Sequence, residues 1–116
     1  MQERRQNVRV RPSADYPIHV DFGSGLVKFQ LFVLDAAVGG VGLELVDDVA
    51  VLPVGSEVRL GVTLPGVPRF ETTGVIRYTQ GRAGGRCGVH FNKLSETQQS
   101  ALSKAVSELL ERGHSA

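Results

Sequence analysis

Six short runs of β-forming residues, separated by glycine- and proline-containing turns, dominate the sequence from residue 17 onward. The runs are Ile18 to Phe22, Val27 to Leu34, Val41 to Val46, Glu57 to Leu64, Phe70 to Tyr78 and Gly85 to Phe91. Several alternate between apolar and polar residues, as Val89 and Phe91 do around His90, which indicates strands with one buried face. Six short antiparallel strands at this spacing predict a small closed or nearly closed β-barrel over residues 16–94.

The last part of the sequence predicts one amphipathic helix over residues 95–112. Ser95 and Gln98 have the spacing of a capping box, and Gly113 follows the last apolar residue. The apolar residues recur at three- and four-residue spacing, namely Leu102, Ala105, Val106, Leu109 and Leu110. We expect this stripe to pack on the barrel, and binding to a partner protein is the alternative. The predicted fold class is therefore all-β with a C-terminal helix.

The overall composition suits one globular domain and gives no general attraction for nucleic acid. The chain has 116 residues, of which 41% are hydrophobic and 22% charged, so it can bury a core. Thirteen basic and twelve acidic residues give a formal charge of +1, which provides no protein-wide field for DNA or an anionic membrane. The single cysteine, Cys87, is expected to be a buried, inert thiol. The sequence shows neither a signal-peptide pattern nor an apolar stretch long enough to span a membrane, so we expect a cytoplasmic protein.

Basic charge is concentrated in the polar, proline-containing segment 1–15, which predicts a flexible leader. Arg4, Arg5, Arg9 and Arg11 lie there. Ten of the thirteen basic residues in the chain are arginines, whose planar guanidinium groups suit phosphates and guanine edges. This composition favours a planar anionic ligand, although a basic leader is often only a solvated tail.

No pattern of catalytic or metal-binding residues emerges from the sequence. His19, His90 and His114 lack the spacing of metal ligands, and Cys87 has no obvious base partner. His19 and His90 are expected to face solvent from alternating strands. We therefore expect no enzyme activity and no metal site.

Residues 35–42, Asp-Ala-Ala-Val-Gly-Gly-Val-Gly, end one predicted strand and open the next. Glycines at such a position expose the backbone and allow another molecule to approach it closely. A tight bend between strands would explain the same glycines without any ligand.

The order of these features resembles the PilZ domain family over essentially the whole chain. The resemblance consists of Arg5-x-x-x-Arg9 in the leader, a strand, and then Asp35-x-x-x-x-Gly40 at the junction of the next two strands. It continues in residues 74–77, Gly-Val-Ile-Arg, in residues 88–91, Gly-Val-His-Phe, and in the closing helix.

The resemblance implies a non-enzymatic receptor for the bacterial second messenger cyclic di-GMP. Arg5 and Arg9 would contact guanine edges and phosphates, and Asp35 would accept hydrogen bonds from guanine nitrogens. Gly39 and Gly40 would let the backbone approach the ligand, and the leader would fold onto the barrel when the ligand binds. Arg4 could stack on a guanine and favour two mutually stacked ligands per protomer. Binding would change the conformation or the oligomeric state, for example as a homodimer, and signal to a downstream protein.

One position departs from the family pattern. A serine usually follows the acidic residue by two positions, and this chain has Ala37 there. The missing hydroxyl leaves open an alternative in which the domain has lost nucleotide binding and is a protein-interaction module in motility or pilus assembly. Because one neutral hydrogen bond contributes about 0.5–1.5 kcal/mol, the retained Arg5, Arg9 and Asp35 favour binding.

Overall fold

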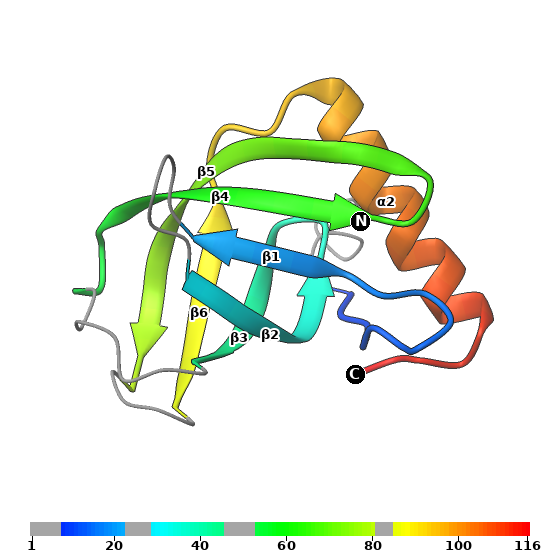
Figure 1. Ribbon diagram of the computed structural model, residues 1–116, viewed down its shortest axis with the longest axis horizontal. Coiled ribbons are helices and arrows are strands. Elements are labelled where there is room, and N and C mark those ends of the chain that lie inside the picture. The colour runs from blue at the N-terminus through cyan, green and yellow to red at the C-terminus, as the bar shows by residue number, and fades with distance from the viewer. Residues whose placement is uncertain (1–7, 23–28, 46–52, 81–84) are drawn as a thin grey trace.

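The computed structural model describes residues 8–22, 29–45, 53–80 and 85–116. Their strands are β1 (His19–Phe22), β2 (Phe29–Ala37), β3 (Gly40–Leu45), β4 (Glu57–Leu64), β5 (Val67–Thr79) and β6 (Arg86–Phe91), and their helix is α2 (Glu96–Glu111). All strand pairs are antiparallel, in the closed order β1-β2-β3-β6-β5-β4 (Figure 1). The predicted six-stranded barrel with one C-terminal helix is confirmed.

Alternation along each strand sends one set of side chains into the barrel. In β4, for example, Leu60 and Val62 are fully buried, whereas Arg59 between Val58 and Leu60 is exposed. His19 and His90 are exposed, as their strand positions predicted. The inward side chains form one continuous apolar core.

Helix α2 lies across one end of the barrel (Figure 1) and completes this core. It begins with the predicted capping box, in which Ser95 accepts from the Gln98 backbone and the Gln98 side chain accepts from the Ser95 backbone. Four of the predicted apolar positions are buried, namely Leu102, Ala105, Val106 and Leu109. Leu110 remains 41% exposed because it lies at the edge of the stripe.

Two strands extend further than the sequence predicts. Strand β2 continues past Leu34 to Ala37, because its pairing with β3 runs on to the Ala37–Gly40 pair and leaves only two residues for the turn. Strand β5 begins at Val67 and includes Pro68, which the sequence placed in a turn. Pro68 is tolerated because the pairing of β5 with β6 starts only at Gly74. Asp35 and Ala37 are therefore strand residues.

The leader is part of the fold from Val8 onward. Val10 is fully buried, and its backbone forms bridges with Ala36 of β2 on one side and with Ser115 on the other. Both hydrogen bonds of the Val10–Ala36 bridge measure 2.9 Å. This differs from the expectation of a loose leader over residues 1–15, because the Val10 side chain is buried in the core, Val8 packs against it, and backbone hydrogen bonds hold the segment to β2. Residues 1–7 lie outside the described part of the chain.

Among the described residues, no helix has the length and apolar character needed to span a membrane.

Candidate ligand-binding site

The leader and β2 bring together two of the residues that the sequence singled out. Because Val10 points into the core, its neighbour Arg9 points outward, toward Asp35. Arg9 donates from Nε to Asp35 Oδ1 at 2.8 Å, and its Nη2 forms a second contact with the same oxygen. The side chains are 42% and 31% exposed, so this ion pair is open to solvent and to a ligand.

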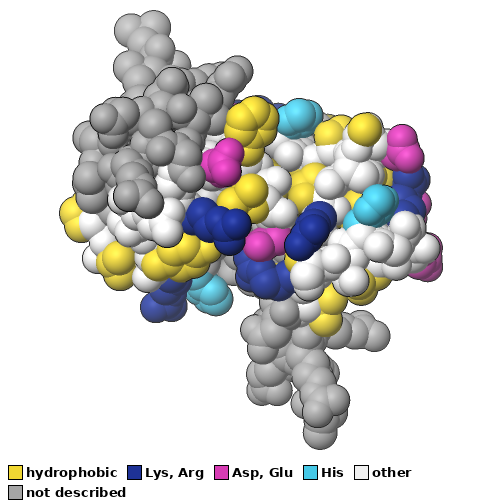
Figure 2. Space-filling model, turned by 90° about the horizontal axis from the view of Figure 1, so that it is seen from below, with side chains coloured by type: hydrophobic (Ala, Val, Ile, Leu, Met, Phe, Trp, Pro, Cys, Tyr) yellow, Lys and Arg dark blue, Asp and Glu magenta, His cyan; other side chains and the backbone are white. Residues whose placement is uncertain are grey.

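Arg9 and Asp35 line a pocket on the outer surface of β3, β6 and β5. Its volume is about 320 Å³, at the lower end of the range for small-molecule sites. The other lining residues are Gly39, Gly40, Val41, Arg77, Tyr78, Gly88, Val89 and His90. The pocket thus combines two arginines with a carboxylate, a phenol, an imidazole and glycine backbone. Figure 2 shows a face of the molecule on which basic, acidic and hydrophobic side chains adjoin one another.

Gly39 and Gly40 form one side of the pocket, and the fold itself requires glycine at position 40. A Cβ atom there would overlap the backbone carbonyl oxygen of Val89 on β6. The Gly39 carbonyl accepts a hydrogen bond of 2.8 Å from the Phe91 backbone. The glycines therefore hold the β2–β3 turn close against β6, and because they have no side chains, backbone atoms form this part of the pocket wall.

The remaining predicted site residues are placed as follows. Ala37 is only 1% exposed and does not line the pocket. Alternation puts its side chain on the same face of β2 as Asp35, where it is nevertheless buried. Arg4 and Arg5 lie outside the described residues.

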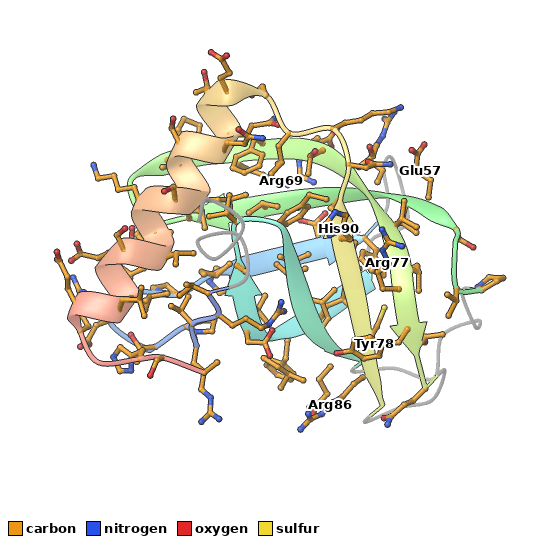
Figure 3. All side chains as sticks on the ribbon, turned by 180° about the vertical axis from the view of Figure 1, so that it is seen from behind. Glu57, Arg69, Arg77, Tyr78, Arg86 and His90 are labelled. Carbon is orange, nitrogen blue, oxygen red and sulfur yellow. The ribbon has the colours of Figure 1, made fainter. Side chains whose placement is uncertain are left out.

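Three polar side chains of the pocket were not predicted as site residues. Arg77 and Tyr78 come from β5 and His90 from β6, and Figure 3 shows Arg77 and His90 close together on these neighbouring strands. The segments 74–77 and 88–91 carried a resemblance in the sequence, but nothing in them indicated which residues face the pocket. Which of these side chains face the pocket depends on the register between β5 and β6, and this register is a property of the tertiary structure.

The described residues show no group of three or more His, Cys, Asp or Glu side chains that could hold a metal ion. Cys87 is 1% exposed, and its burial raises the pKa of the thiol. An uncharged buried thiol is a poor nucleophile.

Comparison with known proteins identifies the family. The family model described as the PilZ domain matches residues 3–108. The chain belongs to the PilZ domain family. The match includes the arginine-rich leader, the whole barrel and most of the helix of this PilZ domain. A search of curated proteins found no match.

Solved structures agree with this PilZ fold at low sequence identity. The PilZ domain of YcgR from Escherichia coli with c-di-GMP is 15% identical, with a TM-score of 0.69 and 90% of each chain covered. The K. pneumonia MrkH–c-di-GMP complex is 13% identical, with a TM-score of 0.74, 90% of this chain and 52% of that chain covered. The Bacillus subtilis inhibitor of motility MotI/DgrA is 18% identical, with a TM-score of 0.69 and coverages of 91% and 49%. The PilZ domain thus spans about half the length of the latter two proteins.

Proposed function

We propose that the chain is a cytoplasmic receptor for cyclic di-GMP that changes its conformation or oligomeric state on binding and so signals to a partner protein. The observation that carries this proposal is the meeting of Arg9 and Asp35 in one pocket, since the resemblance in the sequence assigns both residues to the family's ligand-binding motifs. Two of the structures similar to this one, YcgR and MrkH, were solved with c-di-GMP. The name of the B. subtilis protein suggests motility as a process to examine.

The chemistry of the pair suits a guanine nucleotide. A carboxylate offers about four acceptor positions, so Asp35 can hold Arg9 and still accept from the N1–H and N2–H₂ groups of guanine. Arg9 has further N–H donors that can reach the guanine O6 and N7 atoms or a phosphate oxygen. Arg5 would supply the second motif arginine and Arg4 a stacking cation, and both assignments rest on the family resemblance.

The test is a calorimetric titration of the purified chain with cyclic di-GMP at fixed ionic strength, with cyclic di-AMP as the matched control. Adenine has no N1–H donor for Asp35, so we expect binding of cyclic di-GMP and binding at least tenfold weaker of cyclic di-AMP. Two ligands per protomer would support the stacking role of Arg4, and one ligand would exclude it.

A folded chain that gives no heat with cyclic di-GMP would contradict the proposal. That result would favour the alternative of a nucleotide-independent interaction module, to which the absent hydroxyl at Ala37 points.

A further inference from the structure

A single row of cross-strand pairs links four residues, of which Asp35, Gly88 and Tyr78 line the pocket. Asp35 of β2 pairs with Gly42 of β3, Gly42 pairs with Gly88 of β6, and Gly88 pairs with Tyr78 of β5. Residues paired directly across strands have their side chains on the same face of the sheet. The row therefore has a carboxylate at one end, a phenol ring at the other, and two residues without side chains between them.

The side chains at both ends lean over these glycines. The Asp35 Oδ1 atom lies 2.7 Å from the position that a Cβ atom of Gly42 would occupy. The Tyr78 ring takes the place of a side chain at Gly88, where an added Cβ atom would overlap its Cε1 atom. Only glycine at position 88 lets the ring lie there. The ring thus rests on backbone and is still 50% exposed.

A β-bulge turns Tyr78 to this face. The register between β5 and β6 shifts between Ile76 and Tyr78. Ile76 is fully buried, and strict alternation would send Tyr78 inward as well. The extra residue, Arg77, restores the outward direction, so that two consecutive side chains both line the pocket. Bulges frequently re-aim side chains beside binding sites. Strand β2 has a corresponding shift between Val33 and Asp35, which aims the other end of the row.

Arg77 adds positive charge to the same end of the pocket. It is exposed, and none of the described acidic side chains forms an ion pair with it. The exposed Arg69, in contrast, is held by Asp21 and Glu71, which raise its pKa. Arg77 therefore places a positive charge at the pocket wall. No described acidic residue pairs with this charge.

We propose that Tyr78 is a stacking platform for a guanine base of the ligand and that Arg77 binds one of its phosphates. The inference rests on the proposed function. It adds a second group of ligand contacts, on the sheet at the other end of the row from Arg9 and Asp35. Aromatic rings stack on bases, and an arginine pairs with phosphate through two donors. A dinucleotide with two bases and two phosphates can contact both ends of the row.

Tyrosine fluorescence tests the stacking directly. The sequence has no tryptophan and only two tyrosines, Tyr16 and Tyr78, so the Tyr16→Phe variant leaves Tyr78 as the sole emitter. We expect its emission, corrected for absorption by the nucleotide, to be quenched in proportion to bound cyclic di-GMP. The matched control is Tyr78→Phe, whose remaining Tyr16 lies 5.2 Å from the Arg112 guanidinium and outside the pocket. Its emission should not change.

Calorimetry gives the energetic test. Tyr78→Phe should bind within about twofold of the parent, and Tyr78→Ala about five- to a hundredfold more weakly. Arg77→Gln should weaken binding and reduce its salt dependence. Arg59→Gln, which removes an exposed arginine outside the pocket, should do neither.

The outcomes separate this inference from the proposed function. If the parent binds cyclic di-GMP while Tyr78 emission is unquenched and Tyr78→Ala binds like the parent, the stacking role is wrong and the receptor function stands. If the parent itself does not bind, both fall. Since the Tyr16→Phe measurement uses an intact pocket, it decides the question even if Tyr78→Ala does not fold.

Discussion

Arg9 and Val10 point to opposite sides of one backbone segment, so that Arg9 reaches the Asp35 carboxylate while Val10 is buried in the core. The segment is held in place by backbone hydrogen bonds on both sides. Ala36 exchanges two bonds with Val10, and the Arg9 carbonyl accepts from the Ala116 backbone at 3.0 Å. The proposed ligand contact of Arg9 and the contribution of Val10 to stability thus belong to neighbouring residues, and substitutions can separate them.

Arg9→Ala should reduce affinity for cyclic di-GMP at least tenfold without lowering the melting temperature by more than a few degrees. The Arg9–Asp35 pair is partly exposed, and such pairs contribute about 0–1 kcal/mol to stability. Its contacts to a nucleotide would be charge-assisted and lost on truncation. Titration calorimetry and thermal unfolding measure the two effects. Arg5→Ala should behave in the same way, and Arg11→Ala, an exposed leader residue outside the pocket, should bind normally.

Val10→Ala should have the opposite signature. Val10 is 0% exposed, and removing its two methyl groups should lower the free energy of unfolding by about 2 kcal/mol. Urea denaturation measures this change. Affinity should fall less than for Arg9→Ala, because the backbone bridges to Ala36 and Ser115 are kept. A variant as stable as the parent would show that the leader is not part of the core.

Gly40→Ala should destabilise the fold because the new Cβ would overlap the Val89 carbonyl oxygen, which is backbone and cannot rotate away. Forcing β3 from β6 should cost about 1–3 kcal/mol, measured by thermal unfolding. Gly66→Asn is the matched control: Gly66 has φ +74°, which asparagine tolerates, and nothing lies within 4 Å of its added Cβ. The control should lose much less stability, and equal losses would exclude the steric explanation.

Cys87 should make the fold less stable at alkaline pH. Burial raises the pKa of its thiol in the folded state above the ordinary value of 9.0. Above pH 9 the unfolded chain therefore releases this proton first, so the stability contributed by the neutral thiol is present below pH 9 and lost as the pH rises. Urea denaturation at increasing pH, compared with Cys87→Ala, measures the difference. The thiol should also react with alkylating reagents only when the chain unfolds, and rapid labelling of the folded protein would contradict its burial.

The sequence predicted those parts of the fold that depend on local patterns. Strand β4 has the predicted bounds, Glu57–Leu64, because its alternation and its flanking turns are both local. The capping box and the apolar stripe likewise located helix α2. The family resemblance assigned Arg9 and Asp35 to one ligand site, but it did not predict the ion pair between them that the structure shows.

The remaining features depend on tertiary pairing that no single segment records. Val8 and Val10 alternate with Arg9 and Arg11, but two apolar residues in a polar segment are too few to indicate burial. The outward direction of Tyr78 requires the bulge, and the bulge exists only in the pairing with β6. The sequence does not indicate that Gly88 must be glycine, because that requirement comes from the Tyr78 ring packed against it in the folded structure.

Ala37→Ser should increase affinity for cyclic di-GMP. Alternation puts Ala37 on the same face of β2 as Asp35, although its side chain is 1% exposed and does not line the pocket, so a hydroxyl there gains a ligand contact only if the bound turn brings residue 37 to the ligand. A neutral hydrogen bond contributes about 0.5–1.5 kcal/mol and one to a charged phosphate about 1.5–3 kcal/mol, which corresponds to roughly a threefold to hundredfold gain. We expect the lower half, because water must be displaced.

The neighbouring Ala36→Ser is the matched control for that gain. Ala36 is equally buried but belongs to the apolar core, so its hydroxyl would be placed among apolar side chains and should lower the melting temperature without raising affinity. Both variants are titrated at the same ionic strength, since the arginine contacts to phosphate are sensitive to salt. A folded Ala37→Ser protein that binds no better than the parent would mean that residue 37 does not face the ligand. The correspondence of Asp35 to Gly40 with the family motif would then have to be revised, while the Arg9–Asp35 pair, which is observed independently of it, would remain the centre of the site.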